Sequence, residues 1–293
     1  MVDLSIIILS YNTKDLTIQC VKSVVKQYQK ELERKEIEII VVDNNSVDDS
    51  VLAISSLFLK NFSVKLILNK ENLGFAKGCN IGAKAAKGKY ILFLNSDTQV
   101  EDEGFIQMAV FLDKNPKIAI LGGKLRNSDG SIQRSAGKFY NLLSLIIMLF
   151  GLERFGFLRS SPNKIQKVDW VSGACMMVRS DIFKKLSGFD ESLFMYVEDM
   201  EICFRAKKLD FLTYFYPNIS LRHKSLGSSN RTFAIINVYK GILHFYSKHK
   251  NRLEYLIAKT LLIAKAEILI LIGFLTSNSD LKNRYKKAIN FDL

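Results

Sequence analysis

Short apolar runs alternate with amphipathic segments through the first 120 residues. The apolar runs predict strands at 4–10, 37–42, 64–68 and 90–94. Between them, apolar residues recur with a helical period, which predicts helices at 13–29, 47–59 and 75–86. This alternation is typical of βαβ units with right-handed crossovers. We therefore expect an α/β fold, with a mostly parallel, twisted sheet flanked by helices.

Polar side chains gather where each predicted strand ends. They are Ser10, Tyr11 and Asn12 after the first strand, Asp43 after the second, Asn72, Gly74, Lys77 and Asn80 after the third, and Asn95, Ser96 and Asp97 after the fourth. The carboxyl ends of parallel strands meet at one edge of a sheet, and ligands bind there. We expect these groups to form one site with hydrogen-bonding groups suited to a nucleotide.

Some of these residues have a structural alternative. Asp43 and Ser46 suit a helix cap, although Asp43 precedes the cap position, where its carboxylate is placed to accept from a base or ribose. Tyr11 suits either the core or a stacking surface for a base. The segment 74–80 matches neither GxGxxG nor the Walker pattern, which argues against a dehydrogenase or a P-loop enzyme.

Composition narrows the class of protein. Hydrophobic residues make up 48% of the 293 residues and proline occurs three times, so we expect a well-packed globular body. A net charge of +13 predicts a polyanionic partner, which is nucleic acid, an anionic membrane or a phosphate-bearing substrate. No basic motif with interleaved aromatics is present, so we expect no nucleic acid. The four cysteines lack CxxC spacing, which fits a reducing cytoplasm, and the run 4–9 is too short for a signal peptide.

The middle of the chain holds weaker signals. A helix at 101–115 and a strand at 117–121 precede Asp129-Gly130, a hairpin signal. Arg134, just after it, either faces the site or is solvated. The apolar segment 139–158 is too short and too interrupted by glycine to span a bilayer comfortably. It is either a buried helix or a loop that touches lipid, and core packing is the preferred interpretation.

A second polar cluster lies near residue 200. Trp170 begins a strand over 170–178 with a bend at Gly173, and the pattern predicts a helix over 195–206 with acidic residues in its first turn, where the helix dipole favours them. Adjacent Glu198 and Asp199 point in different directions and cannot both serve the helix end, so one is available for chemistry. His223, beyond a predicted strand at 212–216, is either a satisfied structural histidine or a ligand.

Four motifs together resemble the family-2 inverting glycosyltransferases of the GT-A fold, closest to the bacterial rhamnosyltransferase-like branch. They are Ser-Tyr-Asn at 10–12, Val-Val-Asp-Asn-Asn-Ser at 41–46, Asn-Leu-Gly-Phe-Ala-Lys-Gly-Cys-Asn at 72–80 and Phe-Leu-Asn-Ser-Asp at 93–97. The resemblance covers residues 1 to about 225. It implies a Rossmann-like half that binds a nucleoside-diphosphate sugar through the strand-end residues named above.

The resemblance also implies a divalent metal, Mg²⁺ or Mn²⁺, held by a DxD-type motif that bridges the donor phosphates. Here the motif is Asn95-Ser96-Asp97, which leaves Asp97 as the one strong ligand, helped by Asn95 through its carbonyl or a water. One or two carboxylates suffice for such an ion when phosphates and water complete its shell. In metal-dependent members a histidine in the position of His223 closes the coordination.

The segment from Glu198 to Arg205 resembles the acidic catalytic motif of the family. On that basis Asp199 is the general base that deprotonates an acceptor hydroxyl, and Glu198 orients the helix or the acceptor. A carboxylate base acts in its ionised form, and the neighbouring Glu198 favours a modest rise in its pKa. Trp170, Gly173 and Arg134 are candidates for acceptor contacts, with Trp170 either a stacking platform for a sugar or a core residue.

The chain changes character at residue 231, where it becomes helical, basic and apolar. The stretch 255–275 is long enough to span a bilayer, but Lys259, Lys265 and Glu267 make spanning marginal. We expect a helix that lies in the membrane interface or packs on the catalytic domain; an ordinary appendage or oligomer interface is the alternative. The side chains expected to face anionic headgroups are Lys240, Lys248, Lys250, Arg252, Lys282, Arg284, Lys286 and Lys287.

The sequence thus predicts a catalytic domain over 1–230, with a donor half (1–121) and an acceptor half (122–230), and a helical extension over 231–293. The expected protein is a cytoplasmic, peripheral membrane glycosyltransferase. It moves a sugar, with a leaning toward rhamnose on thymidine diphosphate, to a glycan or polyprenyl-diphosphate-linked acceptor. The alternative from another class is a non-catalytic nucleotide-sugar-binding protein, which the missing first carboxylate favours.

Overall fold

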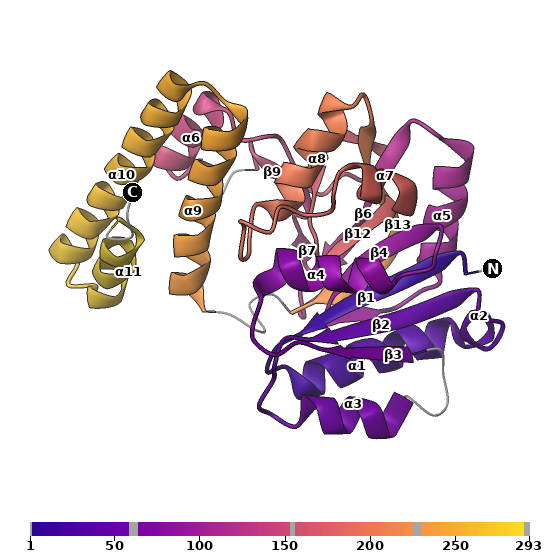
Figure 1. Ribbon diagram of the computed structural model, residues 1–293. Coiled ribbons are helices and arrows are strands. Elements are labelled where there is room, and N and C mark those ends of the chain that lie inside the picture. Colours follow the sequence, from indigo (N-terminus) through magenta and orange to yellow (C-terminus); the bar gives the residue numbers. More distant parts are fainter. Residues whose placement is uncertain (1, 59–63, 153–155, 225–229, 290–293) are drawn as a thin grey trace.

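The computed structural model describes residues 2–58, 64–152, 156–224 and 230–289, and a large mixed sheet forms its centre (Figure 1). Eight strands follow one another across this sheet in the order β10-β13-β6-β12-β4-β1-β2-β3, while β5 pairs with β13 and β7 with β6. The strands are β1 (Leu4–Ser10), β2 (Ile37–Asp43), β3 (Val64–Leu68), β4 (Tyr90–Asn95), β5 (Thr98–Val100), β6 (Ile118–Arg126), β7 (Ile132–Gln133), β10 (Gln166–Val168), β12 (Cys175–Arg179) and β13 (Leu212–His223). A small sheet has the order β11 (Trp170–Val171), β8 (Ala136–Gly137), β9 (Arg159–Ser160).

Strand direction brings the predicted polar residues to one edge. The four strands β3, β2, β1 and β4 are parallel, and their register aligns Ser10 with Asp43 and Leu9 with Asn95. Because β12 is antiparallel to both β4 and β6, β6 runs in the direction of β4, and β13 is parallel to β6. The carboxyl ends of β1, β2, β3, β4, β6 and β13 therefore lie at the same edge, as the α/β pattern predicts.

Helices cover both faces of the sheet. They are α1 (Lys14–Gln27), α2 (Gln29–Glu33), α3 (Ser50–Phe58), α4 (Gly74–Ala85), α5 (Gly104–Lys114), α6 (Leu142–Leu149), α7 (Ser180–Lys185), α8 (Glu198–Lys208), α9 (Arg231–His249), α10 (Arg252–Leu275) and α11 (Ser279–Ile289). Successive residues of β1 point to opposite faces. Ile6 and Ile8 therefore pack in the core that contains α1 and α5, while Ile7 packs in the core that contains α4, α7 and α8.

Most predicted elements occur where the pattern places them. Strands β1 and β3 have the predicted bounds, and β7 pairs with β6 across the turn at Asp129-Gly130. The predicted helix at 47–59 begins later, at Ser50, and residue 59 lies outside the described residues. The interpretation of 139–158 as core is confirmed only in part. Among its described residues, 142–149 form a helix. Ser144 and Leu145 are buried there, but Leu143 is 64% exposed.

The C-terminal helices are joined to the rest of the chain through α9. Tyr239, Ile242, Phe245 and Tyr246 of this helix are buried in the same core as α4 and α8. Helix α10 contacts α6, α9 and α11, and Figure 1 shows α10 and α11 on the outer side of α9, away from the large sheet. In the part of the chain that the structure describes, no helix has the length and apolarity needed to cross a membrane.

Candidate active site

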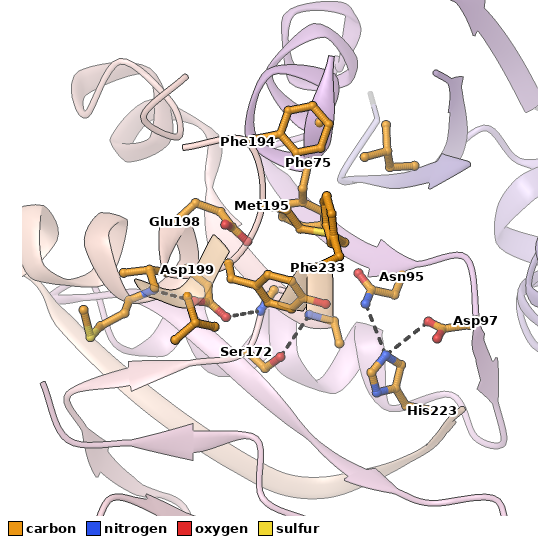
Figure 2. Close-up of a pocket in the computed structure, with 18 of the residues that line it drawn as sticks. Phe75, Asn95, Asp97, Ser172, Phe194, Met195, Glu198, Asp199, His223 and Phe233 are labelled. Atoms are coloured by element: carbon orange, nitrogen blue, oxygen red, sulfur yellow. Dashed lines mark hydrogen bonds and ion pairs between the residues drawn. The ribbon is translucent and has the colours of Figure 1, made fainter. Parts of the chain in front are cut away.

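The polar strand ends border a cavity of about 660 Å³ (Figure 2). Its wall is built from the ends of β1, β4, β6 and β13, the start of α4, the segments 170–174 and 194–200, and α9. The predicted site residues that line it are Tyr11, Asn72, Gly74, Asn95, Ser96, Asp97, Arg134, Trp170, Gly173, Glu198, Asp199 and His223. The fold thus brings most residues of both predicted clusters to a single cavity, including Asp97 and Asp199, which are more than 100 residues apart in the sequence.

Asp97 and His223 meet at one end of this cavity. The short strand β5 begins directly after Asp97 and pairs antiparallel with the end of β13, which aligns Thr98 with His223. His223 Nε2 lies 3.1 Å from Asp97 Oδ1 and 3.2 Å from Asn95 Nδ2, as Figure 2 shows. Strand pairing, rather than a flexible loop, therefore sets the position of the histidine beside the carboxylate.

Gln133 fixes which nitrogen of His223 carries the hydrogen. His223 Nδ1 lies 2.6 Å from Gln133 Oε1, and Gln133 Nε2 donates to Asn127 Oδ1 at 2.9 Å. The second bond sets the orientation of the amide, so its oxygen accepts and Nδ1 must donate. In the neutral imidazole, the lone pair of Nε2 is then directed toward Asp97. Gln133 was not predicted as a site residue.

This arrangement fits a divalent cation. Two adjacent ligands of an octahedral ion at about 2.1 Å are roughly 3 Å apart, which matches the separation of Nε2 and Oδ1. Among the described residues, no group of three or more His, Cys, Asp or Glu side chains is arranged to hold a metal ion. Asn95 directs its amide nitrogen, not its carbonyl, to His223. The protein would thus supply Asp97 and His223, and phosphate and water the remaining ligands.

Asp199 and Glu198 occupy another part of the cavity wall, at the start of α8. The predicted start of this helix at residue 195 is wrong, because Tyr196 and Val197 have left-handed φ angles of 70° and 73° and the helix begins at Glu198. Asp199 Oδ2 accepts from the Gly173 N–H at 3.1 Å, and Oδ1 accepts from the Met200 N–H at 2.8 Å. The bend at Gly173 therefore positions the carboxylate that the sequence singles out as a base.

Burial perturbs both acids. It raises the pKa of Glu198 well above the ordinary value, and the charge of Asp199 raises it further. Burial also raises the pKa of Asp199, although the Gly173 N–H and the charge of Arg159 oppose the rise. Glu198 is 5% exposed, and its Oε2 has no hydrogen-bond partner among the described residues. As pH rises, Asp199 therefore ionises first, while Glu198 keeps its proton.

Arg159 is a site residue that no motif in the sequence singles out. Its guanidinium lies 5.3 Å from the centroid of the Trp170 ring, and it lines the cavity together with Tyr140. Tyr140 and, more weakly, Asp199 raise the pKa of this guanidinium. Strand pairing places Arg159, Gly137 and Trp170 in one row of the small sheet. A side chain at Gly137 would meet the Trp170 ring at 2.7 Å, so glycine is needed there.

Trp170 itself is mostly buried, with 3% of its surface exposed. Its Nε1 donates to the Lys138 carbonyl at 2.9 Å, and Arg159 lies over its ring. The ring therefore supports the cation that faces the cavity and offers little surface of its own for a sugar. Arg134 also lines the cavity, and its guanidinium packs against Gly156.

The donor side of the cavity is formed by the strand ends. Tyr11, 37% exposed, lines it after β1, and Asn72 and Gly74 line it before α4. Gly74 has φ +78°, and a Cβ here would lie 2.3 Å from the Phe194 carbonyl oxygen, so no other residue fits. Asn44, unpredicted as a ligand, joins these pieces: its Nδ2 donates to Asn72 Oδ1 and to the Gly74 carbonyl.

Asp43 lies at the end of β2, deep in this edge. The Ser46 N–H donates to its Oδ2 at 2.8 Å, which is the capping contact considered from the sequence. Its Oδ1 is buried and has no hydrogen-bond partner among the described residues. A buried carboxylate oxygen without a partner is costly, so a donor from a ligand would be favourable at this position.

Besides Asp43, four other predicted donor-binding residues do not line the cavity. Ser10 is buried among hydroxyls, 2.9 Å from Thr17 Oγ1, and Asn12 bridges two loops by accepting from the Val47 N–H. Asn80 uses both ends of its amide on the backbone of Phe189, which ties α4 to a neighbouring turn. Lys77 is exposed on α4. The structure gives the first three a role in positioning the loops around the site.

Helix α9 closes the cavity on the side facing the 194–197 segment. Asn230, Phe233 and Val238 line it, and the rings of Phe233 and Phe194 are in edge-to-face contact at 6.0 Å between centroids. No sequence motif marked this contribution, because the basic and apolar composition after residue 231 suggested a separate extension. The predicted boundary at residue 230 therefore separates residues that share one cavity.

Comparison with known proteins identifies relatives of this arrangement. The N-acetylglucosaminyl-diphospho-decaprenol L-rhamnosyltransferase of Mycobacterium tuberculosis (strain CDC 1551 / Oshkosh) is 24% identical over 217 residues, which cover 67% of this chain and 69% of that protein. Rhamnosyltransferase WbbL of Escherichia coli (strain K12) is 26% identical over 169 residues, 55% of this chain and 64% of that one.

Solved structures show the same fold at low identity. The mannosyltransferase PcManGT from Pyrobaculum calidifontis, in complex with GDP-Man and Mn²⁺, has a TM-score of 0.61 and 13% identity, covering 99% of this chain and 87% of that one. GalNAc-T7 with UDP, GalNAc and Mn²⁺ has a TM-score of 0.61 and 18% identity, covering 84% of this chain and half of that one. The fold is therefore GT-A-like, as the motifs imply.

The match to a known family extends over most of the sheet and its strand-end residues. Residues 5–187 match the family described as Glycosyl transferase family 2, and this segment includes the four motifs and Asp97. The matched segment is more than half of the chain. The chain therefore belongs to glycosyl transferase family 2.

Proposed function

We propose that the protein transfers one sugar from a nucleoside-diphosphate sugar to a hydroxyl of a glycan or lipid-linked glycan, with inversion at the anomeric carbon. The observation that carries this proposal is the joint placement of two groups in one cavity. One is the Asp97–His223 pair at the strand ends, and the other is Asp199 at the start of α8. The first group is suited to binding a diphosphate with its metal, and the second is suited to accepting a proton from the acceptor hydroxyl.

The reaction is a single displacement. The acceptor oxygen forms a bond to the anomeric carbon while the bond from that carbon to the leaving phosphate oxygen breaks, and the hydroxyl proton passes to Asp199. The nucleoside diphosphate leaves with the bonding electron pair. Asp199 is held for this task by the N–H groups of Gly173 and Met200. An ionised carboxylate with a raised pKa is a better proton acceptor than one with an ordinary pKa, and the pKa of Asp199 is raised by burial.

Asp97 and His223 are the residues proposed to hold Mg²⁺ or Mn²⁺. When bound, the ion neutralises charge on the leaving diphosphate. The chain's own contribution is the orientation of these two ligands: Gln133 holds the hydrogen on His223 Nδ1, and β5 pairing fixes the histidine beside the carboxylate. The Mn²⁺ named with two solved relatives supports the choice of metal.

Tyr11, Asn72 and Asp43 are proposed to contact the nucleotide. The buried Asp43 Oδ1 offers an acceptor for an N–H or O–H of base or ribose. The names of the mycobacterial and Escherichia coli relatives favour rhamnose as the sugar, and the mycobacterial name favours an acceptor linked to a polyprenyl diphosphate. Arg134 and Arg159 supply positive charge in the cavity for such an acceptor.

The test separates donor binding from transfer. A thermal-shift panel of nucleoside-diphosphate sugars with Mg²⁺ or Mn²⁺ identifies the donor, and transfer is then measured with Asp199→Asn. We expect this variant to bind the donor as the wild type does and to transfer about 10² to 10⁴-fold more slowly, the range for loss of a general base. Transfer unaffected by Asp199→Asn or by a chelator would overturn the mechanism. Donor binding without any transfer by the wild type would favour the non-catalytic alternative.

A further inference from the structure

Helix α10 carries a row of exposed apolar side chains along its outer surface. We call this row the α10 face; its members are Leu253, Leu256, Ile257, Ile268, Leu271, Ile272 and Leu275. Their exposed fractions range from 38% to 72%. With 3.6 residues per turn, these positions fall on one side of the helix. A long exposed apolar face on a folded protein marks a surface that contacts something else.

Helix α6, which packs against α10, also has exposed apolar side chains. They are Leu143 and Ile146 within the helix and Phe150 directly after it. The chain on either side of α6 leads to the active site: Tyr140 lies just before the helix, and Arg159 follows it nine residues after Phe150. The apolar surface is thus connected through α6 to the side of the cavity that holds the two arginines.

The C-terminal helices α9, α10 and α11 are together strongly basic. Residues 231–289 contain eleven Lys or Arg against three Asp or Glu, a net charge of +8 out of +13 for the whole chain. Arg252, Lys259, Lys286 and Lys287 form no ion pair with any residue that the structure describes. By contrast, Lys248 is bound by Asp190 and Glu201, so the expectation that it faces headgroups is wrong.

Charge selects the partner for this face. A two-fold contact with a second copy would bring two strongly positive surfaces together, which is unfavourable. An anionic lipid surface offers apolar acyl chains to the α10 face and phosphate groups to the lysines. No described helix is suited to crossing a bilayer, and the polar residues Thr260 and Glu267 are exposed on the same side of the helix as the α10 face. A position along the membrane surface buries the apolar side chains and leaves these two polar groups in contact with water.

We propose that the α10 face, together with the exposed side of α6, docks on an anionic membrane and holds the arginine side of the cavity toward the lipid. The link to the cavity rests on the proposed function, since a lipid-linked acceptor would approach from that surface. The docking itself is independent of catalysis. It is a peripheral contact that uses side chains already exposed on the folded chain, so it requires no rearrangement of the protein.

Vesicle flotation of the full chain tests the docking. We expect the wild type to float with vesicles of phosphatidylglycerol and phosphatidylcholine and to remain mostly unbound with phosphatidylcholine alone. The variant Leu256→Asp/Leu271→Asp should lose about tenfold or more in its partition to the anionic vesicles, because two apolar contacts are replaced by two negative charges. The matched control is Leu52→Asp/Val110→Asp, which makes the same kind of change on the exposed surfaces of α3 and α5 and should float as the wild type does.

The outcomes separate docking from folding and from function. Equal thermal midpoints for the two variants and the wild type show that a loss of flotation is not a loss of fold. Equal flotation of the two variants would overturn the proposal. So would a wild type that is a dimer by light scattering and becomes monomeric in the Leu256→Asp/Leu271→Asp variant with vesicle binding unchanged. Flotation needs no donor, so failure of the proposed transferase function leaves this result readable.

Discussion

Gln133 offers the sharpest test of the metal-side geometry, because it acts on the ion only through His223. Replacing it by leucine removes the oxygen that accepts from His223 Nδ1 at 2.6 Å and keeps a side chain of comparable bulk. The imidazole is then free to carry its hydrogen on Nε2 instead. In that tautomer a hydrogen, not a lone pair, faces Asp97 Oδ1 at 3.1 Å, and the histidine no longer serves as a ligand.

The size of the effect follows from this single bond. Loss of a partner that orients a metal-bound histidine typically costs about 10 to 100-fold in metal affinity, or roughly 1.4–2.7 kcal/mol. The upper part of this range is expected here, because Asp97 and His223 are the two protein ligands proposed, and the described residues contain no group of three or more His, Cys, Asp or Glu side chains suited to a metal ion. Asp97 remains, so binding is weakened and not abolished.

Electron paramagnetic resonance titration of Mn²⁺, in the presence of a nucleoside diphosphate, measures this affinity without turnover. Gln133→Glu retains an acceptor for Nδ1 and should bind Mn²⁺ close to the wild-type level. His223→Ala should show a loss at least as large as that of Gln133→Leu. A Gln133→Leu protein that binds Mn²⁺ within about twofold of the wild type, while His223→Ala does not, would refute the orienting role of Gln133.

Two further predictions concern the base and the attachment of α9. Glu198→Gln should leave the acidic limb of the pH profile of kcat/KM in place, since Glu198 is still protonated when Asp199 ionises. Arg159→Gln should move that limb to higher pH, because the guanidinium lowers the pKa of Asp199. Identical profiles for the two variants would contradict this. Glu201→Gln should destabilise the fold by about 3–5 kcal/mol and lower Tm by about 5–8 °C, because the fully buried Glu201 binds Arg205, Lys248 and His249. The control Glu36→Gln, at the exposed ion pair with Arg34, should change stability by less than about 1 kcal/mol. Burial raises the pKa of Glu201, but the charge and hydrogen bonds of Arg205 and the hydrogen bonds from Lys248 and His249 outweigh it and hold the pKa below the ordinary value. The stabilisation is therefore complete above the unfolded pKa, near pH 4–5, and is lost as pH falls through the depressed value, which a calorimetric pH series measures.

Local patterns were sufficient to predict the sheet. The run 90–94 is apolar at every position, a pattern typical of a strand that is buried on both faces. In the structure β4 lies between β1 and β12, and both of its faces are covered. Polar residues directly after such strands were therefore placed correctly at one edge. The same reasoning could not separate Asn72, which lines the cavity, from Asn80, whose amide is used on the Phe189 backbone, because both follow the same strand and have the same chemistry.

Residues that act through tertiary contacts left no local signal. Gln133 was part of a predicted hairpin, but its bond to His223 depends on β6 and β13 being neighbours, although 85 residues separate the end of β6 from the start of β13. Arg159 reaches the cavity only because β9 pairs with β8 and Gly137 leaves room for the Trp170 ring. Pairing of short strands from distant segments is set by packing of the whole domain, so a sequence window cannot reveal it.

The attachment of α9 changes how the C-terminal helices relate to catalysis. Val197, directly before the base helix, has a φ of 73°, which is strained for a β-branched residue. Gly241 of α9 accommodates it, because a Cβ at Gly241 would lie 2.7 Å from Val197 Cγ2. Glu201 of α8 is meanwhile bound by Lys248 and His249 of α9. The composition after residue 231 reflects the outer surface of these helices, whereas the inner surface of α9 holds the segment that carries Asp199. A contact that orients α10 and α9 at a membrane would therefore also orient the base.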